Sequence, residues 1–452
     1  MSRLGSRVVL CHGVWDLVHL GHVHHLEEAR RQGDALVVSV TPDEHAAKAP
    51  DRPVYPQAMR AEMLASLACV DAVILSEGAT AVKAIEAVRP AVYCKGKEYA
   101  HGELSQLEIE AAERVGARVH FTDGPVQSSS ALINRHLDVM APEVREYLTR
   151  AREKGFAARI PVLIESIADM KVLFAGETII DEYVYVSGLG KPSKENILAV
   201  HSQDREIFTG GVVAASNHAR SFVAQADVIS ARTITKRRYV DRNGTRKLFE
   251  VYEGELGPIT EAEEIETIRE IEAKAPQADL VVVVDFGHGM MTPNVVESLI
   301  ANSRWLAVNT QTNSANHGFN TLRKYHSADY ACVDLPEARL ALDAPHIDAT
   351  EAVFRLSGET ILDVIVTDGT RGCVVGHRMR RIPAFSTRSV DTMGAGDAFL
   401  AVTAPLAKMS SPDLEIVGFV GNIVGALKCQ VIGHRASVNK VTVLRYCATL
   451  LK

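Results

Sequence analysis

Short apolar runs that alternate with helical stretches constrain the fold of this chain more than any other feature of its sequence. In the first 140 residues, apolar runs lie at 7–12, 35–41, 72–75, 91–94 and 117–121, and helical patterns lie at 57–68, 80–88 and 103–115. This alternation predicts a doubly wound parallel sheet. A second series of buried-type strands follows at 171–175, 279–284, 305–309 and 362–367. We therefore predict an α/β protein with two successive sheets.

The chain is long enough for two domains. Its 452 residues exceed what one hydrophobic core usually organises. Charged and amphipathic helical stretches that begin at Pro142 and Pro161 separate the two series of strands. We predict a first domain over 1–138, a helical linker over 139–169 and a second domain over 170–452.

Composition restricts the partners and the location of the protein. The net charge of −7 argues against a general nucleic-acid role, so phosphate ligands would be bound by local basic clusters. The seven cysteines are scattered, which is typical of buried thiols in a reducing compartment. We find no signal peptide and no apolar run of membrane-spanning length. We expect a cytoplasmic enzyme with small-molecule ligands and with no nucleic-acid or membrane partner.

The most specific chemical motif is Asp391-Thr-Met-Gly-Ala-Gly-Asp397, which follows an extended segment and opens an apolar helical run. The small residues Gly394, Ala395 and Gly396 allow a tight turn at which successive N–H groups face an anion. Asp397 then lies where a carboxylate can accept the proton of an attacking hydroxyl. A glycine-rich turn with an N-capping Asp is the alternative interpretation. The strand–turn–helix context favours a phosphoryl-transfer site.

A second motif lies near the N-terminus. The strand at 7–12 is followed by Gly13-Val-Trp-Asp16 and then by His19-Leu-Gly-His22, at the start of a helical stretch that runs through Arg31. This spacing puts both imidazoles on one helix face, beside unpaired N–H groups and the positive end of the helix dipole. Such a site suits a nucleoside triphosphate. Two surface histidines on an amphipathic helix are the alternative.

Basic residues occupy strand ends and loops of the first domain, where ligands bind in open α/β sheets. They are Lys48, Arg52, Arg60 and Lys95, the last followed by Gly96. No Cys or carboxylate stands at ligand spacing beside His24 and His25. We therefore interpret these two histidines as exposed or packing residues and predict no metal-ligand set.

The first domain resembles the cytidylyltransferase-like nucleotidyltransferases, and in particular the adenylyltransferase half of bacterial bifunctional heptose kinase/adenylyltransferases. The resemblance covers nearly all of residues 7–136 and rests on Gly-x-Trp-Asp, His-x-Gly-His, Gly33-Asp34, Arg52-Pro53-Val54, Arg60, Val70-Asp71, Lys95-Gly96 and Ser128-Ser129-Ser130. It implies that a phosphate monoester attacks the α-phosphorus of a nucleoside triphosphate in line and that pyrophosphate leaves.

This resemblance also implies a role for each matching residue. His19 and His22 would stabilise the pentavalent centre, and Lys48 and Arg60 would neutralise the phosphates. The nucleotide site would be completed by Gly13, Asp16, Lys95, Gly96, Ser129 and Ser130.

The second domain resembles the ribokinase-like (PfkB) sugar kinases, through the motif that ends at Asp397 and through weaker matches in the same order. Residues 183–252 show short alternating patterns, and Asn243-Gly244 is typical of a hairpin turn. This segment looks like the small β-lid that covers the sugar in that family and often pairs with a second subunit. We therefore expect a homodimer.

The same resemblance implies two groups of binding residues. On the substrate side are Asp181, Gly210, Gly211 and Asn217, with Lys236 and Arg238 as contacts of a sugar phosphate; a solvated hairpin face is the alternative for these two basic residues. On the nucleotide side are Asp334, Glu337, Thr367, Gly369, Gly372 and Asn422, together with Gly394, Ala395 and Gly396. The pair Asp334 and Glu337 takes the place of a family Asn-x-x-Glu near the Mg²⁺–phosphate site.

Two lysines of the heptose kinases are absent from this chain. Gln311 stands where that family has the Lys of Asp-Pro-Lys, and His288 stands where it has the Lys of Asp-Tyr-x-Lys-Gly. The loss of cations near phosphates lowers transition-state stabilisation or indicates a different acceptor. The order of the domains is also reversed, with the transferase first.

We predict a bifunctional enzyme of sugar-nucleotide biosynthesis that uses Mg²⁺. Its kinase would phosphorylate a heptose-phosphate-like sugar. Its transferase would convert a sugar-1-phosphate and a nucleoside triphosphate, ATP in preference to CTP, into a nucleotide sugar and pyrophosphate. Two alternatives stay open: a CTP-dependent cytidylyltransferase for a polyol or amino-alcohol phosphate fused to its kinase, and a transferase with a catalytically silent kinase domain.

Overall fold

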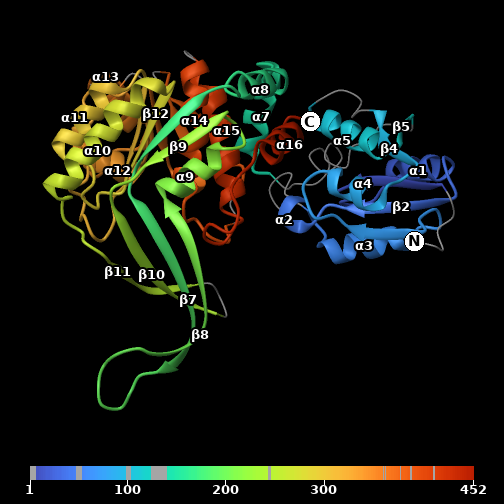
Figure 1. Cartoon of the computed structure of the whole chain (residues 1–452), viewed down its shortest axis with the longest axis horizontal. Coiled ribbons are helices and arrows are strands. Elements are labelled where there is room, and N and C mark those ends of the chain that lie inside the picture. Colours follow the sequence, from blue (N-terminus) through green and yellow to red (C-terminus); the bar gives the residue numbers. More distant parts are fainter. Residues whose placement is uncertain are drawn as a thin grey trace. The chain divides into compact units, whose positions relative to one another are not determined.

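The computed structural model describes residues 7–46, 53–97, 103–123, 140–242, 246–359, 361, 363–376, 378–386, 389–410 and 413–452. The chain forms two compact units, residues 1–148 with 444–452 and residues 149–443 (Figure 1). Within these described ranges no helix is long and apolar enough to cross a membrane.

The C-terminal residues belong to the first unit, although the sequence analysis assigned them to the second domain. They form most of helix α16 (Lys440–Leu450), in which Tyr446, Cys447 and Leu450 are buried. Arg445 donates a hydrogen bond to the backbone carbonyl of Ala79. The buried apolar face and this hydrogen bond explain why α16 joins the first unit. Helices α7 (Pro142–Glu153) and α8 (Phe156–Glu165) occupy the segment predicted as a helical linker.

The described part of the first unit contains a five-stranded sheet in the order β3-β2-β1-β4-β5, with every neighbouring pair parallel. Its strands are β1 (Val8–Gly13), β2 (Ala35–Val40), β3 (Ala72–Leu75), β4 (Val92–Gly96) and β5 (Arg118–Thr122). Its helices are α1 (Leu20–Arg30), α2 (Asp43–Ala46), α3 (Gln57–Ala65), α4 (Val82–Val88) and α5 (Glu103–Arg114).

Apolar side chains cover both faces of this sheet. Leu26 of α1 and Leu64 of α3 belong to the core on one face, and Ile85 of α4 and Ala111 of α5 belong to the core on the other. Because the central strands are buried on both faces, they are continuous apolar runs. The strand order reverses between β1 and β4, so the crevice at their carboxyl ends is the expected place for a ligand.

The described part of the second unit contains an eight-stranded sheet in the order β17-β16-β15-β14-β13-β12-β6-β9. These strands are β6 (Lys171–Gly176), β9 (Gln225–Ile229), β12 (Leu280–Asp285), β13 (Leu306–Thr310), β14 (Tyr330–Asp334), β15 (Asp363–Thr367), β16 (Cys373–Val375) and β17 (Arg380–Ile382). The pairs from β9 to β15 are parallel, and β16 and β17 pair antiparallel.

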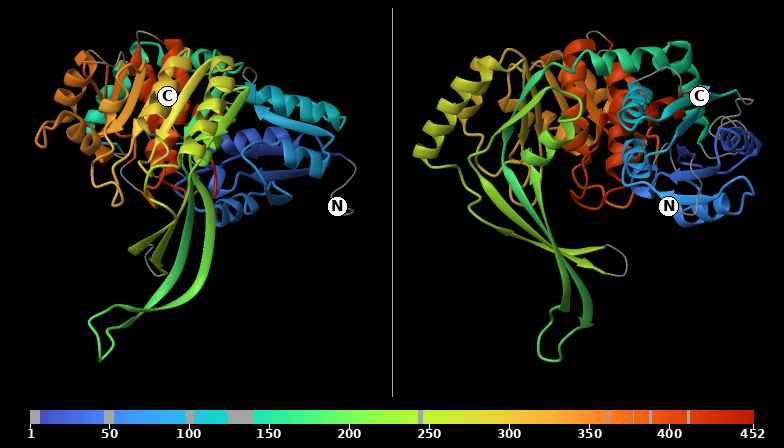
Figure 2. Two further views of the ribbon diagram at one scale, coloured as in Figure 1. Left: turned by 60° about the vertical axis from the view of Figure 1, so that its left-hand side comes forward. Right: turned by 45° about the vertical axis from the view of Figure 1, so that its right-hand side comes forward.

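Helices cover both faces of the larger sheet. One face packs against α10 (Glu261–Lys274), α11 (Pro293–Asn302), α12 (Leu335–Leu342) and α13 (Ala349–Glu359), whose apolar residues share one core with the strands. The other face is covered by α9 (Val212–Ala219), α14 (Ala395–Ser410) and α15 (Leu414–Lys428), and α8 packs against α14 and α15 (Figures 1 and 2).

A four-stranded lid, in the order β11-β10-β7-β8, projects from the larger sheet of the second unit (Figure 2). It is formed, among the described residues, by β7 (Thr178–Gly190), β8 (Ala199–Gly211), β10 (Thr233–Asp241) and β11 (Lys247–Glu253). The segment 183–252, predicted as a β-rich insert, also contains helix α9 and strand β9, and β9 belongs to the larger sheet. The predicted turn at Asn243-Gly244 lies outside the described residues, although the flanking strands β10 and β11 do pair antiparallel.

Candidate active sites

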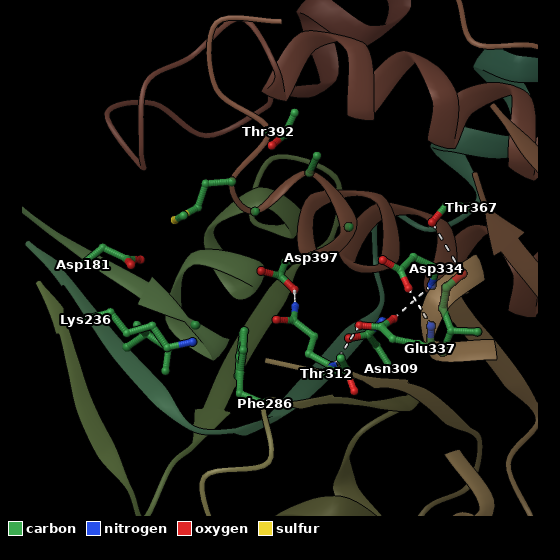
Figure 3. A pocket seen from close by; sticks show the side chains of 18 of the residues that line it. Asp181, Lys236, Phe286, Asn309, Thr312, Asp334, Glu337, Thr367, Thr392 and Asp397 are labelled. Carbon is green, nitrogen blue, oxygen red and sulfur yellow. Dashed lines mark hydrogen bonds between the residues drawn. The ribbon is translucent and has the colours of Figure 1, made fainter. Parts of the chain in front are cut away.

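A cavity of about 320 Å³ opens in the second unit, between the lid and the carboxyl ends of the strands of the larger sheet. Figure 3 shows Asp397 in its middle, with Asp181 and Lys236 on one side and with Asp334, Glu337 and Thr367 on the other. The turn at 392–396 and the side chain of His434 complete this part of the wall. The cavity therefore brings together residues that are more than 200 positions apart in the sequence.

Asp397 lies in the first turn of α14, and its side chain is buried. Gln311, just after β13, donates a hydrogen bond of 2.6 Å from its Nε2 to Oδ1 of Asp397. Burial raises the pKa of Asp397 to about 6. A carboxylate with this pKa is ionised at neutral pH and is a stronger base than an exposed Asp.

The turn before Asp397 is held by a second carboxylate, Asp391. Gly394 has φ 69°, and a Cβ there would lie 2.8 Å from the ring of His434. Only glycine combines that conformation with so little space. Asp391 accepts hydrogen bonds from Tyr183 Oη at 2.8 Å and Lys247 Nζ at 2.9 Å. Burial acts to raise the pKa of Asp391, but these contacts and the N–H of Gly433 outweigh it and lower the pKa to about 2.

Strands β7 and β10 of the lid supply the other side of the cavity. Asp181 is the register partner of Lys236, and both face the cavity. Asp181 pairs with Arg238, and its Oδ2 lies 3.3 Å from Nε2 of His434. A Cβ on Gly210 would lie 2.3 Å from Oδ2 of Asp181, so this position requires glycine.

Lys236 differs from Arg238 in its partners. Its side chain is buried, and its Nζ lies 5.2 Å from the ring centre of Tyr252 and 5.8 Å from that of Phe286. Within the described ranges no carboxylate lies within ion-pair distance of Lys236. Burial, followed by the charge of Arg238, lowers the pKa of Lys236. An ammonium held only by aromatic faces is available to an anionic ligand.

Asp334 and Glu337 form the opposite wall of the cavity. Each accepts a hydrogen bond from the backbone N–H of the other, at 2.9 and 3.0 Å, in a capping box at the start of α12. Glu337 also accepts the N–H of Thr312 at 3.2 Å. Burial raises the pKa of Asp334, and burial together with Asp334 raises that of Glu337. Two adjacent carboxylates with raised pKa values favour a bound cation.

The first unit has a separate site at the start of α1. His19 is the N-cap residue, and its Nδ1 accepts the N–H of Gly21 at 3.1 Å. Nδ1 of His22 accepts the N–H of His19 at 3.3 Å, and the two rings stack with centres 4.0 Å apart. Trp15 and Leu17, in the loop before them, have positive φ values of 56° and 49°. Such strain in non-glycine residues is common at functional sites.

Comparisons with known proteins identify two domain families in this chain. Residues 10–140 match the family described as cytidylyltransferase-like, and residues 223–441 match the pfkB family of carbohydrate kinases. The chain joins a cytidylyltransferase-like domain to a pfkB family kinase domain. Both families, and their order along the chain, were predicted from the sequence.

Curated relatives of this chain include two bifunctional proteins named HldE. The protein of Nitratiruptor sp. is 36% identical over 137 residues, which is 30% of this chain and 29% of that protein. The protein of Methylobacillus flagellatus is 44% identical over 135 residues, which is 29% of this chain and 27% of that protein. The chain thus spans less than a third of the length of these relatives. Ribokinase from Thermotoga maritima, a solved structure, is 13% identical with a TM-score of 0.46, and covers 61% of this chain and 99% of that one.

In the transferase domain, Arg60 is not placed as predicted. Its side chain is fully buried and donates to the carbonyls of Tyr55 and Thr41, both at 2.9 Å, and to Asp43 at 2.6 Å. It also donates to the carbonyl of Val14. A guanidinium so fully engaged holds the loops together and is not presented to a phosphate.

Asp16 and Lys95 are also held by protein partners. Asp16 accepts the N–H of Val54 at 3.0 Å, which fastens the neighbouring loop. Lys95, at the end of β4 before Gly96, pairs with the buried Glu108, which also accepts from Tyr93 Oη at 2.9 Å. A Cβ on Gly13 would lie 3.1 Å from the ring of Trp15. These residues surround the carboxyl ends of β1 and β4.

Of the histidines interpreted from the sequence as exposed or packing residues, His25 makes a specific contact in the transferase domain. His25 bonds to Thr122 Oγ1 at 2.6 Å, and burial lowers its pKa to about 4, so it is a packing residue. The predicted site residues Lys48, Ser129 and Ser130 lie outside the described residues, as does Arg52.

In the kinase domain, five predicted ligand contacts do not line the cavity, and Gly210, described above, is one of them. Nδ2 of Asn422 donates to the carbonyls of Ile382 and Pro383, at 3.1 and 3.0 Å. Asn217 lies on α9. Gly369 and Gly372 bracket a short helical turn after β15, and both have positive φ. Gly211 does line the cavity, with φ 63°.

His288 does not replace the missing lysine. Its side chain is buried and absent from the cavity wall. Burial, followed by the charge of Lys236, lowers the pKa of His288 to about 4. It is therefore neutral at pH 7. Gln311, in contrast, lies in the wall and contacts Asp397 directly.

Sequence reasoning missed three residues of the kinase site. Glu177 accepts the N–H groups of Phe286 and His288 at 3.0 and 2.9 Å and thereby holds the loop after β12. Lys428 and His434 lie 31 and 37 residues beyond Asp397, the end of the motif, and follow no recognisable pattern. For Glu177 the position directly after Gly176, at the end of a buried strand, was the available signal.

Proposed function

We propose that the chain is a bifunctional enzyme of sugar-nucleotide biosynthesis. Its kinase domain transfers the γ-phosphoryl group of ATP to a heptose-phosphate-like sugar. Its transferase domain joins a sugar-1-phosphate to a nucleoside triphosphate and releases pyrophosphate. The position of Asp397 carries this proposal. On one side of Asp397 is the lid with Lys236, which is available to an anionic acceptor, and on the other side is the carboxylate pair Asp334 and Glu337.

The kinase step needs one proton transfer. The oxygen of the acceptor hydroxyl attacks the γ-phosphorus, its proton passes to Asp397, and ADP leaves. Gln311 engages Oδ1 of Asp397 and so orients the carboxylate. The N–H groups at Gly394 to Gly396 begin α14, where the helix dipole stabilises the negative charge of the phosphates.

The lid supports an acceptor that already carries an anionic group. Arg238 is held by Asp181 and by Glu250, at 3.3 Å, so its charge is largely compensated. The ammonium of Lys236 forms no ion pair with a described residue, contacts the rings of Tyr252 and Phe286, and lies on the same face of the lid. A phosphate on the sugar would take this position, and Asp181 would accept hydrogen bonds from sugar hydroxyls.

Asp334 and Glu337 are the residues that would hold Mg²⁺ with the nucleotide phosphates. Mg²⁺ commonly binds through one or two carboxylates plus phosphate oxygens, and it neutralises charge on the leaving group. The raised pKa values of this pair fit such a cation.

The transferase step depends on positioning and on charge. A phosphate oxygen of the sugar-1-phosphate attacks the α-phosphorus, and pyrophosphate leaves. His19 and His22, which lie together at the N-terminus of α1, would contact the triphosphate. We favour ATP as the nucleotide, and the match to a cytidylyltransferase-like family keeps CTP as the second candidate.

A two-part assay tests the proposal. ATP and CTP are each offered with heptose-1-phosphate, other sugar-1-phosphates and glycerol-3-phosphate, and pyrophosphate release is measured. ADP production is measured with heptose, hexose and pentose phosphates. We expect pyrophosphate with ATP and a sugar-1-phosphate, and ADP with a phosphorylated heptose. Activity only with CTP and a polyol phosphate would support the alternative transferase. No ADP production with any acceptor would indicate a silent kinase.

The lid also supports a homodimer. Its edge strand β8 exposes 57% of Ile207, and Leu189 at the tip of β7 is 69% exposed. Exposed apolar residues on an edge strand favour pairing with a second copy. Light scattering should give the mass of a dimer, and Ile207→Lys should give a monomer. The control is Val162→Lys on α8, which is 71% exposed and far from the lid in sequence. A wild-type monomer at micromolar concentration excludes this assembly.

A further inference from the structure

Lys428, at the last position of α15, is buried with no exposed surface in the kinase domain. Its Nζ donates two hydrogen bonds of 2.7 Å, to the backbone carbonyls of Met393 and Gly433. It does not line the cavity. Burying an ammonium costs several kcal/mol unless its surroundings compensate it, so a lysine here needs an explanation beyond packing.

The two carbonyls belong to the loops that shape the active site. Met393 precedes Gly394 in the anion-binding turn, and Gly433 precedes His434, whose ring lies in the cavity wall. The Cε atom of Lys428 lies 3.6 Å from where a Cβ on Gly394 would stand. The ammonium is therefore directly behind the turn that is proposed to bind the phosphates.

The same two residues are bound from the other side by Asp391. Its Oδ1 accepts the N–H of Met393 at 3.1 Å, and its Oδ2 accepts the N–H of Gly433 at 2.9 Å. Each of the two peptide segments thus gives an N–H to a carboxylate and a carbonyl to an ammonium. This double clamp sets the separation of the two loops.

The charge of Lys428 is not consumed by a carboxylate. Asp391 is paired with Lys247 at 2.9 Å, and in the part of the chain that the structure describes no acidic side chain lies within ion-pair distance of Lys428. Its positive charge therefore acts on the turn and on whatever anion the turn holds. The ammonium of Lys428, which two main-chain carbonyls coordinate, therefore resembles a bound monovalent cation that is covalently attached to α15.

We propose that Lys428 is a positioning residue that serves as a built-in monovalent cation for the anion-binding turn at 392–396. Its ammonium occupies the carbonyls of Met393 and Gly433, holds the turn and His434 together, and places a fixed positive charge behind the transferred phosphoryl group. The catalytic part of this inference rests on the proposed kinase function. It follows that the wild-type enzyme does not need a dissolved monovalent cation at this position.

Chemical rescue tests this inference. Lys428→Ala removes the ammonium and leaves a space lined by two carbonyls, and misplacement of the turn should lower kcat about 10²-fold. Ammonium, methylammonium or K⁺ should restore part of this loss, whereas the bulkier tetramethylammonium should not. The matched variant Lys428→Met fills the space without a charge, so its activity should stay low in every salt. A purely structural lysine predicts no difference between the cations.

Thermal unfolding gives a second readout that needs no turnover. Ammonium should raise the Tm of Lys428→Ala above its value in tetramethylammonium at equal ionic strength, and it should leave wild type and Lys428→Met unchanged. If this rescue occurs but wild type phosphorylates no acceptor, the cation site stands and the proposed kinase function fails. If Lys428→Ala folds and neither its Tm nor its kcat responds to any cation, the inference is overturned.

Wild type alone also tests the inference if neither variant folds. Replacing tetramethylammonium with Na⁺, K⁺ or ammonium should change the kinase rate of wild type less than about twofold and should change its Tm little. The reason is that Lys428 already occupies the carbonyls of Met393 and Gly433. Strong activation or stabilisation of wild type by K⁺ or ammonium would show that a dissolved ion is still required and would overturn the proposal.

Discussion

Replacing Asp397 with Asn should stabilise the kinase domain while it removes activity. The side chain is 5% exposed, and burial raises the pKa of Asp397 from its ordinary value near 3.8 to about 6. This shift corresponds to a cost of about 3 kcal/mol for the ionised form in the folded state. Asn has nearly the same shape, can accept the hydrogen bond of Gln311 and carries no charge.

The sign of the effect depends on pH. Below about pH 4, Asp397 is protonated in both the folded and the unfolded chain, so wild type and Asp397→Asn should have similar stability. Between about pH 4 and 6 the folded state keeps a proton that the unfolded state has lost, and wild type progressively loses the stability that this proton gave. Above about pH 6 the full difference applies, and Asp397→Asn should be more stable by up to about 3 kcal/mol.

Calorimetry at pH 5 and pH 8 measures this difference. The transition of the kinase domain in Asp397→Asn should rise by about 5 °C relative to wild type at pH 8, and by less at pH 5. Sugar-dependent ADP production should fall by about two to four orders of magnitude, as expected for loss of a general base. Asp227→Asn, at an exposed carboxylate on β9, is the control and should change neither quantity. Equal or lower stability of Asp397→Asn at pH 8 would refute the desolvation of Asp397.

Three further predictions concern the two sites. Gln311→Lys places a cation against Asp397 and should move the acidic limb of the kinase pH profile at least about one unit below the wild-type value near 6. The control variant Gln311→Met should not lower this value. Coincident pH profiles for wild type and Gln311→Lys would contradict the prediction. His22→Ala should lower pyrophosphate release about 10²-fold or more and leave ADP production intact; near-normal nucleotidyl transfer would show that the site is wrongly placed. Arg60→Met should destabilise the transferase domain by about 3 kcal/mol in urea unfolding, because it leaves Asp43 and three carbonyls without their hydrogen-bond donor. A folded variant of normal stability with weakened nucleotide binding would instead indicate that Arg60 contacts the nucleotide directly.

Local patterns were sufficient to predict the parts of the fold that depend on short segments. The strands of the first unit and the strands β6, β12, β13 and β15 of the second were found within a few residues of their observed bounds, because a strand buried on both faces must be a continuous apolar run. The parallel strands β9 and β14 were not predicted. Helix α9, within the β-rich segment 183–252, was not predicted, and this has a local cause. Helix α9 is only eight residues long and follows directly on Gly211, so its period was hidden between strands.

The two motifs were found because their chemistry is local. Gly394 to Asp397 form a turn and a helix start within a few residues, and so do His19 and His22. A helix N-terminus assembles its own N–H groups, so the sequence determines both the shape and the polarity of such a site.

Tertiary structure alone decided what each charged side chain does. Arg60 and Lys236 are both buried cations, yet Arg60 is engaged by three carbonyls and Asp43, whereas Lys236 meets aromatic faces. Lys428 contacts the turn at Met393 only because the fold brings the end of α15 to that turn. Charge interactions depend on distance and burial, and a linear sequence specifies neither for residues that fold brings together from far apart. The sequence by itself therefore determined the two folds and the two turns proposed to bind anions, and the tertiary structure decided which cations face a cavity and which hold the protein together.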